Sequence, residues 1–173
     1  MQTIRILVLA LACAALTGCR KPEPPPAEPI ATTVPGIPTK AQPRLPTVQL
    51  YIGAQTLTAE VATTAEQVQT GMMFRTNVLE NEGMLFVFGF PHRASFWMKN
   101  CPVDLSAAYI NPDGVILEIH PLEKHNTNSV VAASDNVQFV LETARGWFER
   151  NNITPGTLIR TERGSLKETF FAR

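Results

Sequence analysis

The sequence predicts a mainly β domain, folded as a compact β-sandwich or a partly closed barrel with one or two short helices. Three observations predict this fold class. From residue 48 onward, short segments rich in β-branched and alternating apolar residues recur, and turn residues separate them. Helical periodicity is confined to one or two short stretches. Seven or eight strands with so few helices disfavour a parallel doubly wound sheet.

The predicted strands follow one another with short connections. The first two flank a turn that contains Gly53, as in a hairpin. A later pair flanks an Asn-Pro-Asp-Gly turn at 111–114. In chain order, the predicted strands are 48–52, 56–61, 84–88, 95–98, 106–110, 115–119, 138–143 and 158–161.

Two short helices are expected between these strands. The Thr-Thr-Ala-Glu run at 63–66 is typical of a capping box, and a helical stripe of Val68, Met72 and Met73 follows it. A second helix is expected within 144–151, although its type is less clear from the pattern.

Residues 1–18 are predicted to be a lipoprotein signal peptide. Arg5 makes the start positive, and residues 6–16 carry no polar side chain, as in a secretory signal. A membrane-spanning helix needs about 20 apolar residues, so this shorter run disfavours a permanent span. It ends in Leu-Thr-Gly-Cys at 16–19, which resembles the bacterial lipobox, whose cysteine thiol takes a diacylglycerol. The alternative is an ordinary secretory signal followed by chance by Cys19.

Cleavage before Cys19 would leave residues 19–47 as a lipidated linker and residues 48–173 as one globular domain. Nine prolines between residues 20 and 47 favour an extended chain, with a proline-rich ligand for some partner as the alternative. The expected partner of this end is a membrane, bound through lipid on Cys19. Because Arg20 rather than aspartate follows the cysteine, resemblance to sorted lipoproteins favours the outer membrane, facing the periplasm.

The charge balance gives no sign of a nucleic-acid-binding protein. The chain has 15 Lys or Arg and 15 Asp or Glu, and within 48–173 acidic residues outnumber basic ones by 13 to 10. No dinucleotide, phosphate-loop or nucleophile-elbow motif occurs, so no cofactor is expected. His92, His120 and His125 lack the spacing of a helical zinc site, so no metal is expected either.

Three motifs carry a resemblance to a known family. They are Gly-Met-Met-Phe-Arg at 71–75, Glu-Gly-Met-Leu-Phe-Val-Phe at 82–88 and Phe-Trp-Met-Lys-Asn at 96–100, within a match that spans 58–160. In order and spacing they resemble the domain of unknown function 192 family. The resemblance implies a small, jelly-roll-like β fold, and it implies no particular activity. The chain departs from the family pattern at Cys101, where threonine is usual.

Six residues are candidates for binding a ligand. Strand alternation predicts that Trp97 and Lys99 share one face, and lysine is rarely buried without a partner. If Arg75, Lys99 and Asn100 converge, they would suit a carboxylate, phosphate or sugar oxygen, with a glutamate fixing its orientation. Each residue also has a plainer interpretation as a surface charge, a cap or a packing residue. The candidate set is Arg75, Glu82, Trp97, Lys99, Asn100 and Glu142.

Cys101 is the only cysteine within 48–173, and we expect it to be a small buried side chain. The alternative is a thiol nucleophile paired with a histidine, but no third group that would orient such a pair can be identified. No catalytic residue is therefore predicted.

The sequence favours a binding module, tethered to a membrane, for a small anionic or polar ligand or for an envelope partner. A hydrolase or transferase acting on an envelope polymer is the second hypothesis, with Glu82 or Glu142 as general base and Lys99 or Arg75 stabilising negative charge. A structural or assembly protein of the envelope is the third. A concave site around Trp97 would favour the first two, and a flat apolar patch the third.

The lipid anchor is directly testable. We expect the wild-type protein to incorporate radiolabelled palmitate and Cys19→Ser to incorporate none, because no other thiol lies beside the predicted cleavage site. Membrane fractionation of both forms provides the measurement. A wild-type protein without label that fractionates as soluble periplasmic protein contradicts the anchor.

Overall fold

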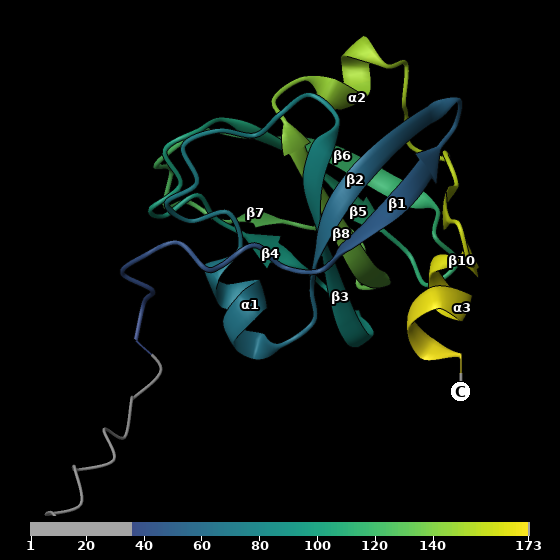
Figure 1. Ribbon diagram of the computed structural model, residues 1–173, viewed down its shortest axis with the longest axis horizontal. Coiled ribbons are helices and arrows are strands. Elements are labelled where there is room, and N and C mark those ends of the chain that lie inside the picture. Colours follow the sequence, from purple (N-terminus) through teal and green to yellow (C-terminus); the bar gives the residue numbers. More distant parts are fainter. Residues whose placement is uncertain (1–35, 173) are drawn as a thin grey trace, which may run out of the picture. The chain divides into compact units, whose positions relative to one another are not determined.

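The computed structural model describes residues 36–172, in which β-strands dominate (Figure 1). The predicted signal segment, Cys19 and the first part of the linker lie outside the described residues. No helix within 36–172 is long and apolar enough to cross a bilayer. In chain order the elements are β1 (Thr47–Ile52), β2 (Gln55–Ala62), α1 (Ala65–Thr70), β3 (Glu82–His92), β4 (Ser95–Phe96), β5 (Leu105–Ile110), β6 (Ile116–Leu122), β7 (Val130–Val131), β8 (Val137–Ala144), α2 (Trp147–Arg150), β9 (Ile159–Thr161), β10 (Gly164–Ser165) and α3 (Leu166–Phe171).

Eight strands form one sheet in the order β10-β9-β1-β2-β3-β8-β5-β6, and β4 pairs with β7 in a separate small sheet. β2 and β3 are parallel and are joined by a crossover that carries α1, whereas the other pairs are antiparallel. Near one end of β6, the Ile116 N–H donates to the Thr157 carbonyl over 2.9 Å. This hydrogen bond joins β6, at one edge of the sheet, to the residues just before β9, near the other edge. The sheet is therefore not closed by continuous strand pairing. The predicted sandwich or partly closed barrel is confirmed.

The centre of the sheet is buried on both faces. Along β8, Phe139 and Leu141 belong to one hydrophobic cluster, while Val140 belongs to a second cluster on the opposite face. α3 contributes to the first cluster, and α1 together with the segment 94–101 covers the second. Figure 1 shows α1 beside β4 on one side of the domain and α3 on the other.

The helix α1 begins with the expected kind of cap, one residue later than predicted. Thr64 accepts the Gln67 N–H over 3.2 Å, and the Gln67 side chain accepts the N–H of Thr64 over 3.1 Å. The shift occurs because β2 continues to Ala62, which leaves Thr63 outside the helix. A glutamine oxygen closes the box as well as a glutamate would.

The residues just before β1, which fall within the predicted linker, contact the domain. The Gln42 side-chain amide donates to the carbonyls of Gln67 and Gly71, at 3.1 and 2.9 Å. The Leu45 N–H donates to the Glu60 carboxylate over 2.7 Å. The packed part of the chain therefore begins before residue 47.

The predicted strand at 95–98 is only half correct, because β4 ends at Phe96. The Met98 N–H then donates to the Asn126 carbonyl, and Asn100 adopts a left-handed conformation with φ 58°, which ends extended structure. Trp97 is 41% exposed. The fully buried tryptophan is Trp147, in the first cluster.

These exposures predict unequal roles for the two tryptophans. We expect Trp147→Ala to lower the free energy of unfolding by about 3–5 kcal/mol, because it empties a large part of the core. Trp97→Ala should cost about 1 kcal/mol or less, since its ring is already exposed. Urea denaturation followed by circular dichroism measures both. Equal losses would show that Trp97 is a core residue after all.

Candidate functional site

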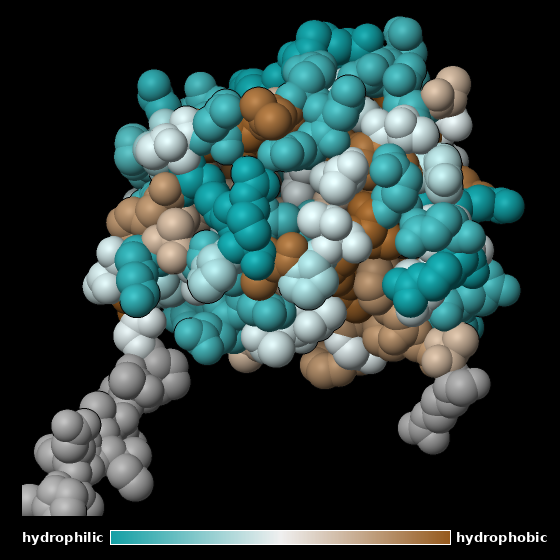
Figure 2. Space-filling view, in the orientation of Figure 1, coloured by the Kyte–Doolittle hydropathy of each residue, from teal (hydrophilic) through white to brown (hydrophobic). Residues whose placement is uncertain are grey.

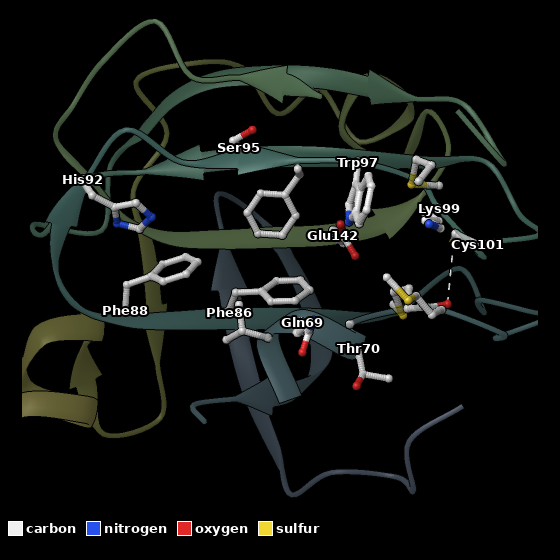
Figure 3. A pocket seen from close by; sticks show the side chains of 16 residues that line it. Gln69, Thr70, Phe86, Phe88, His92, Ser95, Trp97, Lys99, Cys101 and Glu142 are labelled. Carbon is white, nitrogen blue, oxygen red and sulfur yellow. Dashed lines mark hydrogen bonds between the residues drawn. The ribbon is translucent and has the colours of Figure 1, made fainter. Parts of the chain in front are cut away.

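A hollow of about 200 Å³ opens between α1, β3, β8 and the segment 95–101 (Figure 3). Phe86 and Phe88 project into it from β3, His92 lies at one end, and Lys99 and Cys101 lie at the other. Its wall combines aromatic and thioether side chains with several polar ones. The apolar wall consists mainly of Met72, Met73, Phe86, Phe88, Phe96 and Met98.

Glu142 lies on the floor of this hollow because of its place on β8. Side chains alternate along a strand, so Glu142 shares a face with Val140 and points away from Leu141 and the first cluster. Its neighbours across the ladder are Met84 on β3 and Ala107 on β5, both fully buried. A carboxyl is therefore set into an otherwise apolar part of the sheet.

The Glu142 carboxyl is almost completely withdrawn from water, at 4% exposure. Burial, with no other contribution, raises the pKa of this carboxyl to about 8, so it is mostly protonated at pH 7. Within residues 36–172 no hydrogen-bond donor or cation pairs with it. A group in this state can donate a hydrogen bond when neutral or hold a cation when ionised.

Cys101 is buried, as expected, at 3% exposure. Its Sγ lies 3.7 Å from the Met72 carbonyl oxygen and 3.6 Å from that of Val103, which accept its weak S–H bond. Burial raises the pKa of this thiol to about 12, and nearby Glu142 adds to the shift. The thiolate that a nucleophile requires is therefore scarce at neutral pH.

Trp97 and Lys99 lie together at the hollow, as alternation predicted, although not on a strand. The Lys99 Nζ lies 5.3 Å from the centre of the Trp97 ring, which is a cation–π contact. Both residues line the hollow along with Glu142. Three of the six candidates are thus brought to one place.

Arg75 and Glu82 belong to a different cluster. Arg75 Nη2 pairs with the buried Glu60 carboxylate over 2.9 Å, and Arg44 Nη1 pairs with Glu60 over 2.9 Å and with Glu82 over 3.3 Å. Sequence reasoning missed Glu60, because its place in an alternating strand gave no sign of a buried ion pair. The structure thus does not bring Arg75 to Lys99.

Asn100 forms hydrogen bonds with backbone groups of other segments. Its left-handed φ suits asparagine better than most residues, and its carbonyl accepts the Phe74 N–H over 2.8 Å. Its side-chain amide donates to the Pro38 carbonyl over 3.3 Å. Asn100 does not line the hollow.

Four polar lining residues were not among the candidates: Gln69, Thr70, His92 and Ser95. His92 was considered as a metal ligand and, with the other histidines, as a partner for Cys101, whereas its ring packs edge-on against Phe88 with centroids 4.5 Å apart. In the part of the chain that the structure describes, no cluster of three or more metal-ligating side chains occurs. These four lining residues lie in separate elements of the chain, on α1, β3 and β4, and only the tertiary fold places them together.

The raised pKa of Glu142 makes a prediction about stability. Because the folded carboxyl binds its proton more tightly than the unfolded one, the folded state loses stability as pH rises from about 4.5 to about 8. Relative to Glu142→Gln, which cannot ionise, wild type should therefore lose about 1.4 kcal/mol for each pH unit in that window. Urea unfolding of both proteins at pH 5, 6.5 and 8 measures the difference. A difference that does not change with pH contradicts the assignment.

Comparisons with known proteins agree with this fold. No curated protein matches the chain. A crystal structure from Sinorhizobium meliloti 1021, provisionally described as a transcription regulator, is 28% identical, with a TM-score of 0.66 over 70% of this chain and 98% of that one. A protein of unknown function from Novosphingobium aromaticivorans DSM 12444 is 27% identical, with a TM-score of 0.64 over 69% of this chain and 90% of that one. The sequence profile of the DUF192 family, described as an uncharacterized ACR, matches residues 48–161, so the chain belongs to the DUF192 family.

Proposed function

We propose that this protein is a membrane-tethered binding module that takes one small ligand into the hollow above β8. The observation that carries the proposal is the Glu142 carboxyl, buried and without a protein partner on the floor of an open cavity. A buried polar group without a partner lowers stability. A ligand that supplies the missing hydrogen bond or charge offsets that loss, which gives the site its affinity.

The size and wall of the hollow limit the ligand. Its volume of about 200 Å³ is below the roughly 300–1,000 Å³ of pockets that hold drug-sized molecules, so the ligand or its inserted part is small. The aromatic and methionine side chains favour an apolar body, and the polar lining residues favour a ligand that also carries polar groups.

The tether belongs to the same proposal. Lipid on Cys19 would hold the domain at the outer membrane, facing the periplasm, and the proline-rich stretch would separate it from the bilayer. This arrangement suits a protein that captures a ligand beside the membrane.

Acid–base catalysis is the second candidate function, because one specific observation favours it. A carboxyl with a pKa near 8 is well placed to act as general acid or base at neutral pH, and Lys99 lines the same hollow. The nearby thiol is the only cysteine among the described residues, and its raised pKa makes it a poor nucleophile. Binding therefore has stronger support than a hydrolase or transferase.

An assembly protein has less support. On the face seen in Figure 2, hydrophobic residues form several patches with hydrophilic residues between them, rather than one flat apolar surface. Transcriptional regulation, suggested for the Sinorhizobium protein, is not favoured here either, because residues 48–173 carry an acidic excess.

If the hollow binds a small ligand, we expect a small amphipathic probe to change the signal of Trp97 and not that of Trp147. In full-length protein labelled with 5-fluorotryptophan, 2-phenylethanol should shift the Trp97 fluorine resonance saturably and leave that of Trp147 unchanged. Trp97 lines the hollow, whereas Trp147 lies in the first cluster. Trp97→Phe assigns the two resonances.

Two phenylalanines of β3 give a matched control. Phe88 lines the hollow, while Phe90 is 73% exposed outside it. Phe88→Ala should weaken binding of 2-phenylethanol, and Phe90→Ala should not. Equal effects on both tryptophan resonances, or no saturable shift at all, would contradict a binding site in the hollow.

A further inference from the structure

We propose that the ligand of this hollow is an amine with an apolar body, whose ammonium group lies against Glu142. This inference rests on the proposed binding function and deepens it, because it names the chemical class of the ligand. It also departs from the sequence-based expectation of an anionic or neutral polar ligand.

The first argument is the position of Glu142. Its carboxyl is buried, points into the cavity and has no partner from the protein within residues 36–172. A carboxyl in an apolar wall needs a hydrogen-bond donor or a cation, and an ammonium group is both. A ligand carboxylate at the same place would instead require Glu142 to stay protonated, so its affinity would fall as pH rises, which is the opposite pH dependence.

The second argument is the nature of the wall. Phe86 and Phe96 are in edge-to-face contact with centroids 4.9 Å apart, and Phe88 and Phe96 are 6.5 Å apart. The faces of such rings carry partial negative charge and attract cations, and methionine sulfurs are polarizable. The aromatic and thioether part of the wall therefore favours a positively charged group, whereas Lys99 lies at one end of the hollow.

The third argument is the position of Lys99, the lysine that lines the hollow. Lys99 stacks over the exposed Trp97 ring, and no ion pair within residues 36–172 joins it to Glu142. The site that would neutralise the carboxyl is therefore empty of protein cations. The contact of Lys99 with Trp97 also shows that an ammonium group is accommodated beside the aromatic side of this hollow.

Binding an amine requires Glu142 to lose its proton. The proton passes to solvent as the ammonium group enters, so the complex holds one carboxylate and one ammonium ion. The titratable groups around Glu142 are Cys101 on the 95–101 segment and Tyr109 on β5, while Lys99 and His92 line the same hollow. Burial raises the pKa of both Cys101 and Tyr109, which therefore stay neutral near pH 7.

The test uses three probes of similar shape that differ in charge: 2-phenylethylamine, 2-phenylethanol and 3-phenylpropionate. Their dissociation constants are measured on the full-length protein at pH 6, 7, 8 and 9 by the Trp97 fluorine shift and by calorimetry. Glu142→Gln removes the carboxylate with little change of shape. Glu82→Gln is the matched control, because Glu82 pairs with Arg44 away from the hollow.

We expect the amine to bind most tightly of the three at pH 8. Its dissociation constant should fall on the order of 50-fold from pH 6 to pH 8, because the competent fraction of Glu142 rises by that factor when the pKa is about 8. About one proton should be released for each amine bound at pH 6. Glu142→Gln should abolish this pH dependence and weaken the amine by about tenfold or more at pH 8, whereas Glu82→Gln should change neither.

The other outcomes separate the ligand class from the binding function. If 3-phenylpropionate binds best and Lys99→Met abolishes its binding, the ligand is an anion and the amine inference is wrong, while a binding module remains. If the alcohol and the amine bind equally at every pH, Glu142 recognises no charge and the inference is again wrong. If none of the three probes shifts the Trp97 resonance, both the inference and the proposed function fail.

Discussion

The burial of β8 on both faces is the constraint on which the rest of this structure depends. β3 and β5 pair with it on either side, and its central apolar side chains, Phe139, Val140 and Leu141, alternate between two hydrophobic clusters that cover its faces. A polar residue placed there has no route to solvent unless the covering layer leaves a gap. α1 and the 95–101 segment leave such a gap above Glu142, and the hollow results from it.

Much of the fold could be predicted from the sequence, because alternation and turn chemistry are local signals. Asn111 illustrates this: its side-chain oxygen accepts the N–H groups of Asp113 and Val115, as an Asn-Pro-Asp-Gly turn requires. α3 was missed although Ser165 and Glu168 form a capping box, since its six residues give too short a stripe to be recognised. The strand order was not predictable, because β2 and β3 are parallel and only long-range pairing decides this.

The candidate site was only partly predictable, because only some of its residues are linked by local sequence signals. Trp97 and Lys99 were candidates because they lie two residues apart in one distinctive run, and Glu142 was one of two glutamates that could orient a ligand. Arg75 was assigned to the wrong neighbourhood, since its partner Glu60 lies on β2 and nothing local links the two. The sequence left both a binding and a packing interpretation open for Trp97; the chain leaves the strand at Phe96, and the ring is exposed.

The position of Glu142 also bears on how such a protein evolves. A glutamine or an apolar residue at this place would remove the cost of burying the carboxyl, so selection for folding alone gives no reason to keep an acid here. Other proteins of this fold can be sorted by this one position. Under the proposed binding function, we expect a homologue with an acid at this position to keep the ligand site and one with leucine or valine to keep only the fold.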